Sequence, residues 1–220
     1  MFFSNQRLRY KRLLVIIIPL FIALIICGFF TYHSIANSLG IAKPIKKDSL
    51  DIISMDYHLR SNATDYQKEL FNELSELIND GADDATISES VVKNYIADAY
   101  TWDNKKGQWD VGGMCYVYSP MKNNIYYRLR DEFYGMLNKY IDQYGSKGLL
   151  EVSNIETVSL EKGEGKFEVD GNAYDCYIVH CKWQYTNSSR FASEIDNDMM
   201  FDVIKNNDGR FEIVVNYEFK

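Results

Sequence analysis

Apolar residues follow three successive patterns along this chain of 220 residues. The first is an uninterrupted apolar run, Leu13 to Phe30, which contains 18 residues and no charge. The second is a helical repeat of about 3.6 residues in the middle of the chain, and the third is a strand-like alternation in the last third. Their order predicts a membrane segment followed by an α+β domain in which helices precede strands.

The apolar run is long enough to cross a membrane. About 20 helical residues span the roughly 30 Å hydrocarbon core of a bilayer. We therefore predict a transmembrane helix over residues 13–34, in contact with membrane lipid. A cleaved signal peptide is the alternative, because Ser34-Ile35-Ala36 offers small residues at the spacing that a peptidase recognises. Signal peptides normally have a shorter apolar region of about 7–15 residues, which favours an uncleaved anchor.

Charges on either side of this helix predict its orientation. Its N-terminal edge carries four basic side chains and no acidic one: Arg7, Arg9, Lys11 and Arg12. Basic residues tend to stay on the cytosolic side. Residues 1–12 are therefore expected to form a cytosolic tail at the plasma (inner) membrane. Residues 35–56, with lysines around a proline, are expected to form a stalk, and residues 57–220 an extracytoplasmic domain.

Three segments of this domain have helical signals. A capping-box pattern at Thr64–Gln67 opens the first, which runs to a stop signal at Gly81. A second box, Thr86–Glu89, opens a helix with an apolar stripe. The third and longest segment, Tyr126–Tyr144, is expected to be one continuous helix.

Strand signals dominate the C-terminal third. Turn sequences centred on Gly171 and Gly209 each separate two alternating segments, as in β-hairpins. The strand Tyr174–Tyr185 is apolar on both faces, so we expect it to lie inside the sheet, covered on both sides. The final strand, Phe211–Phe219, alternates and is expected to be half-buried. A short strand is also predicted at Met114–Tyr118.

The order of these elements over Ala85–Lys220 resembles the nuclear-transport-factor-2-like (cystatin-like) cone. The resemblance depends on the Val91–Trp102 and Tyr126–Tyr144 helices and on the hairpins at Gly171 and Gly209. In that fold a long helix lies across a curved sheet and leaves a pocket. With a basic tail and a membrane helix in front, the plan is similar to membrane-anchored subunits of conjugation and type IV secretion machines.

A pocket of this kind would be lined by aromatic side chains of the predicted helices and strands. The expected lining residues are Tyr95, Tyr126, Phe133, Tyr140, Tyr177 and Trp183.

The charge balance excludes one class of partner. Residues 1–47 hold seven of the 24 basic side chains and no acidic one, so the remainder carries 17 basic and 31 acidic groups, a net charge of −14. A domain this acidic repels phosphate backbones. Nucleic-acid binding is therefore not expected.

Candidate chemistry is sparse. Cys176 and His180 share a strand face but lie about 13 Å apart, which is too far for a catalytic pair, and no metal-binding spacing occurs. Cys115, Cys176 and Cys181 are expected to be buried free thiols, with a disulfide from Cys115 to either of the others as the alternative. Asp98 is the one candidate catalytic acid, but it lies off the apolar stripe and is interpreted as a solvated carboxylate. No cofactor is predicted.

The segment between the second and third helices is the best candidate for a contact surface. It is rich in glycine and contains two tryptophans that could face a partner or fold back into the core. The residues proposed for contact are Trp102, Trp109, Gly112 and Gly113.

Three classes of function remain compatible with the sequence. The first is a non-catalytic scaffold or assembly subunit of a bacterial envelope machine, which would bind other envelope proteins or a second copy of itself. The second is a small-ligand sensor with an aromatic pocket, and the third is an isomerase- or hydrolase-like enzyme. The sequence favours the first.

Overall fold

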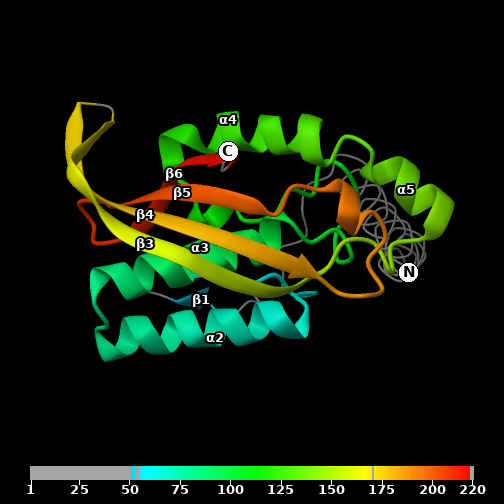
Figure 1. The fold of residues 1–220 in the computed structure, drawn as a ribbon, viewed down its shortest axis with the longest axis horizontal. Coiled ribbons are helices and arrows are strands. Elements are labelled where there is room, and N and C mark those ends of the chain that lie inside the picture. The colour runs from blue at the N-terminus through cyan, green and yellow to red at the C-terminus, as the bar shows by residue number, and fades with distance from the viewer. Residues whose placement is uncertain (1–50, 53–54, 170, 219–220) are drawn as a thin grey trace, which may run out of the picture. The chain divides into compact units, whose positions relative to one another are not determined.

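The computed structural model describes residues 51–52, 55–169 and 171–218 (Figure 1). These residues belong to the compact unit Ser49–Lys220. In this unit helices pack on a curved four-stranded antiparallel sheet, which confirms the predicted α+β class.

The predictions about the membrane concern mainly residues 1–50, which the structure does not describe. The basic tail (1–12), the transmembrane helix (13–34) and the stalk as far as residue 50 lie outside the described residues. Among the helices that are described, none has the length and apolar character needed to cross a membrane. Where the stalk was expected to end, β1 (Asp51–Ile52) pairs with β2 (Tyr57–His58) as a short antiparallel hairpin.

The first long helix, α2 (Asp65–Asp80), begins and ends at the predicted signals. The Thr64 hydroxyl accepts from the backbone N–H of Gln67, and the Gln67 side chain accepts from the backbone N–H of Thr64. These two bonds complete the capping box. At the other end Gly81 adopts a left-handed conformation with φ of 68°, which glycine adopts without strain.

The second helix, α3 (Asp84–Ala99), is the central element of the fold. It begins before the predicted box at Thr86–Glu89, because the Asp83 carboxylate caps the helix by accepting from the backbone N–H groups of Ala85 and Thr86. The helix lies across one face of the sheet and contacts all four strands, while α2 packs on its other side. The predicted apolar stripe is buried throughout: Val92, Tyr95, Ile96, Ala99 and Tyr100.

The predicted third helix, Tyr126–Tyr144, is not continuous. It consists of α4 (Lys122–Arg128), a π-helical turn at Leu129–Phe133, and α5 (Leu137–Tyr144). The prediction of one regular helix was wrong because a π turn adds one residue to the repeat, and an apolar pattern does not reveal such an insertion.

The π turn changes which side chains face the core. The Tyr134 amide bonds to the Leu129 carbonyl five residues earlier, at 2.8 Å. As a result Tyr134 is fully buried, Phe133 is only partly buried, and Met136 is 46% exposed. A regular α-helix would place Leu129, Phe133 and Met136 on one face.

The sheet is a simple meander of four strands. Its order is β3 (Val152–Val169), β4 (Asn172–Tyr185), β5 (Asp198–Lys205) and β6 (Phe211–Glu218). Both predicted hairpins are present, and β4 is an inner strand as expected. The sequence pattern revealed only the last residues of β3, because three register shifts interrupt its alternation.

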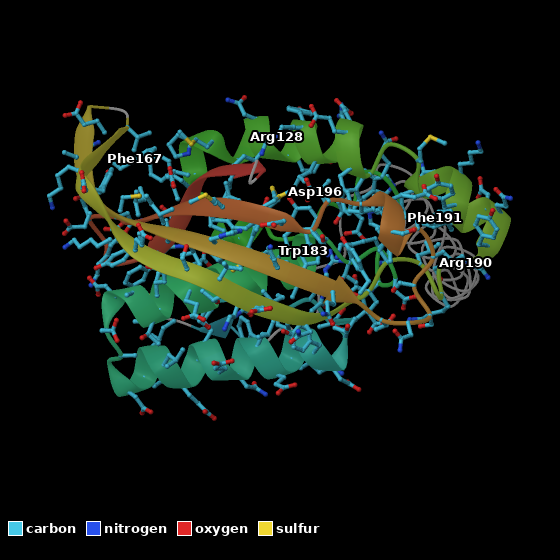
Figure 2. All side chains as sticks on the ribbon, viewed as in Figure 1. Arg128, Phe167, Trp183, Arg190, Phe191 and Asp196 are labelled. Atoms are coloured by element: carbon cyan, nitrogen blue, oxygen red, sulfur yellow. The ribbon has the colours of Figure 1, made fainter. Side chains whose placement is uncertain are left out.

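The core lies mainly between α3 and the sheet. Trp183, near the C-terminal end of β4, is 1% exposed and belongs to this core (Figure 2). A smaller cluster formed by Tyr174, Cys176, Ile204, Val214 and Tyr118 is buried separately. The inner strand β4 contributes to both clusters, as its two apolar faces predicted.

Two local predictions were wrong. Met114–Tyr116 forms a 3-10 helix instead of a strand, and only Val117 makes a β-bridge, parallel to Ile213 of β6. Strand β6 does not alternate regularly, because Val214 is an extra residue opposite the Asp202–Val203 step of β5. A bulge places two residues of one strand opposite one residue of its partner, so the side chains no longer alternate regularly between the two faces at that point.

Tyr57 should be a strong anchor between the β1–β2 hairpin and β6. Its buried hydroxyl donates to the Phe211 carbonyl at 2.5 Å and accepts from the Phe211 amide at 3.2 Å. Tyr57→Phe should lower the free energy of unfolding by about 1–3 kcal/mol, because two buried backbone groups lose their partner. Tyr127→Phe, at a ring that is 51% exposed, is the control and should change it by less than about 0.5 kcal/mol. Equal values in urea titrations would contradict this role.

Candidate functional site

The four residues proposed for partner contact have different surroundings. Trp102 is 2% exposed and packs in the core, with ring centroids 5.0 Å from Phe133. Trp109 is 62% exposed. Gly112 and Gly113 are buried against the end of α3. Of these four, only Trp109 is available to a partner.

The two glycines are required for a close approach of two backbones. A Cβ at Gly112 would overlap the Asp98 carbonyl oxygen, and one at Gly113 would lie 2.7 Å from the Tyr95 ring. Gly113 also has a φ of 79°, which favours glycine. Any larger residue here would push the loop away from α3.

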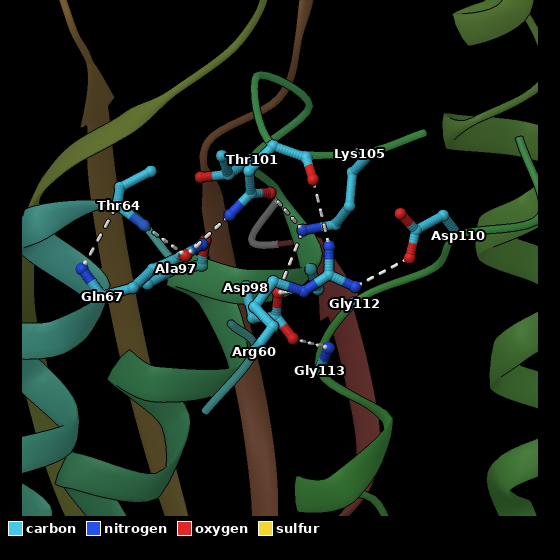
Figure 3. A network of polar contacts seen from close by, with 12 residues as sticks. Arg60, Thr64, Gln67, Ala97, Asp98, Thr101, Lys105, Asp110, Gly112 and Gly113 are labelled. Carbon is cyan, nitrogen blue, oxygen red and sulfur yellow. Dashed lines mark hydrogen bonds and ion pairs between the residues drawn. The ribbon is translucent and has the colours of Figure 1, made fainter. Parts of the chain in front are cut away.

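A network of charges and hydrogen bonds surrounds Asp98 at this junction (Figure 3). The Lys105 ammonium lies 2.9 Å from Asp98 Oδ1 and donates to the Asn104 side chain at 2.8 Å. Arg60 Nε lies 3.2 Å from the same Asp98 oxygen. The Gly113 amide donates to Asp98 Oδ2 at 2.6 Å. Both carboxylate oxygens therefore have partners.

The network extends into the loop that follows. Arg60 Nη2 donates to Asp110 at 2.7 Å, and the other Asp110 oxygen accepts from the Lys106 amide at 2.9 Å. Asn104 donates to Gln67 of α2 at 2.8 Å. The loop between α3 and α4 is thus fixed to α2, to α3 and to the segment after β2.

The charges around Asp98 keep its carboxylate ionised, so that it holds the junction together. Burial tends to raise the pKa of Asp98, but the charges of Lys105 and Arg60 and the Gly113 N–H outweigh it and lower that pKa to about 2. Burial lowers the pKa of Lys105 to about 8, with Asp98 acting in the opposite direction. The interpretation of Asp98 as a solvated surface carboxylate was wrong, because its side chain is only 20% exposed and is ion-paired.

The six residues expected to line an aromatic pocket differ in burial and in their neighbours. Tyr95 and Trp183 are buried in the core, where both rings contact Tyr100, with centroids 6.4 and 4.7 Å away. Tyr140 of α5 stacks on Phe191 at 4.2 Å, and Figure 2 shows the position of Phe191 next to α5. Phe133 and Tyr126 are partly buried, and Tyr177 is 8% exposed. None of the six is among the residues that line the two polar pockets next to His58, Arg60 and Asp98.

Exposed aromatic side chains gather instead around Trp109. We call Trp109, Tyr126, Tyr127 and Arg130 the Trp109 surface. The Tyr126 hydroxyl donates to the Trp109 carbonyl at 3.0 Å, and the Tyr126 and Tyr127 rings meet edge to face at 5.4 Å. The Arg130 guanidinium lies 4.7 Å from the centre of the Tyr127 ring, which is itself 51% exposed. Arg130 belongs to the π turn.

A polar cleft borders the network and shares Arg60, Asp98 and Gly113 with it. Its volume is about 240 Å³. Residues from five separate segments line it, including His58, Arg60, Asp98, Gly113, Lys122 and Arg210. The sequence did not reveal this cleft, because its cations are far apart in the chain and form no motif.

Cysteine and histidine chemistry is not favoured by the surroundings. Cys115, Cys176 and Cys181 are buried and unpaired. Burial raises the pKa of the Cys115 and Cys181 thiols to about 12, so both stay protonated at neutral pH. His180 lies 2.5 Å from Asp198. Within the described part of the chain, no group of three or more His, Cys, Asp or Glu side chains could hold a metal ion.

Comparison of the chain with protein-family models, with curated proteins and with solved structures found no match.

Asp98→Asn should destabilise the protein by about 3–5 kcal/mol at pH 7, because it leaves the buried Lys105 ammonium without an anionic partner. The measurement is urea unfolding of the full-length chain, followed by tryptophan fluorescence. Asp142→Asn, at an exposed position of α5, is the matched control and should cost less than about 0.5 kcal/mol.

The same variant has a pH signature. The folded-state pKa of Asp98, about 2, lies below its ordinary value of 3.8, so its stabilising effect is complete above pH 4 and is lost as the pH falls toward 2. The difference in unfolding free energy between the wild type and Asp98→Asn should narrow by about 2 kcal/mol over that range. A difference that stays constant would show that the carboxylate charge is not what stabilises this junction.

Proposed function

We propose that this protein is a membrane-anchored, extracytoplasmic, non-catalytic assembly subunit of a bacterial envelope machine, of the conjugation or secretion type. It docks onto another envelope protein, or onto a second copy of itself, through the Trp109 surface. The observation that carries this proposal is the 62% exposure of Trp109 next to the Tyr127–Arg130 pair.

The composition of the surface supports docking. Tryptophan, tyrosine and arginine are the residues most enriched among the energetic hot spots of protein interfaces. An exposed tryptophan also keeps a large apolar area in water, which burial against a partner would remove. Met136 and Tyr144, which are also exposed, extend the apolar character along α5.

The surface is held in place before any partner binds. Gln108 donates from its backbone to Asn138 at 2.9 Å and from its side chain to the Arg130 carbonyl at 3.1 Å. Asp110, on the other side of Trp109, is fixed by Arg60. A preorganised loop loses less conformational entropy on binding, which favours affinity.

A non-catalytic role is supported by the state of Asp98. An acid or base that works near neutral pH needs a pKa near 7. The pKa of Asp98 is lowered to about 2, and both of its oxygens are already engaged. The carboxylate that most resembled a catalytic group therefore serves the structure.

The fold itself we propose to be of the nuclear-transport-factor-2-like type. The support is the order of the elements: two helices, an interrupted third helical segment, then a four-stranded meander with α3 across one face. The membrane anchor is supported by the 18-residue apolar run Leu13–Phe30 behind a basic tail.

Docking can be tested with a photo-crosslinking amino acid at position 109. In membranes of the native host, irradiation should give an adduct of higher mass that contains a second envelope protein or a second copy of the chain. The same amino acid at Val158 is the matched control, because Val158 is also exposed (47%) but lies on β3. Recovery of the monomer alone from position 109, or the same adducts from both positions, would contradict the proposal.

Trp109→Ala separates docking from folding. The variant should lose the partner in pull-downs from cross-linked membranes while its unfolding free energy changes by less than about 0.5 kcal/mol, as expected for an exposed site.

The proposed topology has its own test. Protease added to cells whose outer layers have been made permeable, with the plasma membrane intact, should remove the domain and leave a small N-terminal fragment. A cytosolic marker protein serves as the control for membrane integrity. A fully protected chain would place the domain on the cytosolic side and would exclude an envelope role.

A further inference from the structure

We propose that the polar cleft is a binding site for a small oxyanion, a carboxylate or phosphate group of a small molecule, held by Arg210, Lys122 and Arg60. This inference is separate from docking through the Trp109 surface, since it depends on different residues. The observation behind it is that Arg210 faces the cleft with most of its hydrogen-bonding capacity unused.

The donors of Arg210 are largely unsatisfied. A guanidinium carries five N–H donors. Nη2 donates to the Cys115 carbonyl, but Nη1 lies 3.8 Å from the Asp56 carboxylate, which is beyond hydrogen-bonding distance. Nε is buried and makes no hydrogen bond, although Glu212 lies 3.4 Å away. A side chain that is 15% exposed would normally have more of these donors paired.

The position of Arg210 is nevertheless fixed. Its guanidinium stacks 5.0 Å from the centre of the Tyr57 ring, and Tyr57 is anchored to Phe211 by two hydrogen bonds. A planar cation held in one orientation is suited to an oxyanion, because it can present two parallel N–H groups to two oxygens.

Two further cations reach the same cleft. Lys122, at the start of α4, forms no ion pair with any residue that the structure describes, and it lines the cleft. Arg60 lines it as well and is held by Asp98 and Asp110. The three cations come from different elements, so an anion between them would be contacted from several sides.

The acidic groups at the cleft offset part of these charges, since Arg210 is ion-paired with Glu212 at 3.4 Å and with Asp56 at 3.8 Å. Asp98 is neutralised by Lys105, by Arg60 and by the Gly113 amide. Asp56 is 96% exposed at the rim, where water screens its charge. Glu212 is the one acid beside Arg210 Nε, and its Oε2 accepts from Asn206. The remaining cationic capacity belongs to Lys122 and to the unpaired donors of Arg210.

The size of the cleft limits the ligand. A volume of about 240 Å³ accommodates one small anion together with some water, given that a water molecule takes up about 30 Å³ in the liquid. The net charge of −14 over residues 48–220 disfavours a long polyanion.

The test uses the full-length protein in detergent, with inorganic phosphate and succinate as separate probes. Thermal unfolding and calorimetric titration are compared with sodium chloride at matched ionic strength. We expect at least one probe to raise the midpoint of unfolding in a saturable way. A response to phosphate alone assigns a phosphoryl group, and a response to succinate alone assigns a carboxylate.

Variants then locate the site. Lys122→Gln should weaken binding of the active probe by about tenfold, because a charge-assisted hydrogen bond is lost. Lys139→Gln, with the same change of charge at an exposed position of α5, should leave it unchanged. Asp56→Asn should strengthen binding, since it removes a negative charge from the rim. If neither probe binds, or if Lys122→Gln and Lys139→Gln behave alike, the proposal is wrong.

Discussion

The rest of this structure depends on the ion pair between Asp98 at the end of α3 and Lys105 in the loop that follows. A Lys105 ammonium with no exposed side-chain surface requires an anion at close range, and Asp98 provides it at 2.9 Å. The Gly113 amide donates to the second oxygen of the same carboxylate, so two points of the loop are attached to one residue. The path of the chain between α3 and α4 is therefore set by one carboxylate.

Such a pair contributes more to geometry than to net stability. Removing two charges from water costs several kilocalories per mole for each ion, which offsets most of their attraction. The contacts of Asp98 with Lys105 and Gly113 fix the position of the loop that carries Trp102 and Trp109. Trp102 turns into the core and Trp109 turns out to solvent, while Gly112 and Gly113 come into contact with α3. A loop fastened only by apolar contacts would have no comparable requirement for one orientation.

Features that depend on neighbouring residues could be predicted from the sequence. Features that depend on residues far apart in the chain could not. The capping box at Thr64 and the turns at Gly171 and Gly209 depend on neighbours within about four residues, so the sequence reveals them. The π turn before Tyr134 and the bulge at Val214 have no such signature, because each is an insertion of one residue that tertiary packing stabilises. The surroundings of Asp98 could not be predicted for the same reason, since Arg60 and Lys105 reach it from outside its own helix.

A domain with a large negative net charge can still contain a local cluster of cations, such as the one at the polar cleft. Net charge describes the average over a surface, whereas the potential at one point depends on the few charges within about a Debye length, roughly 8–10 Å. Arg60, Lys122 and Arg210 are separated by many residues, but the β2 segment, the start of α4 and the start of β6 converge on one cleft. Because acidic side chains elsewhere repel large polyanions, only a small anion can reach these three cations without meeting that repulsion over a wide area. In the proposed site, the confinement of these cations to one cleft would select for the size of an anion as well as for its charge.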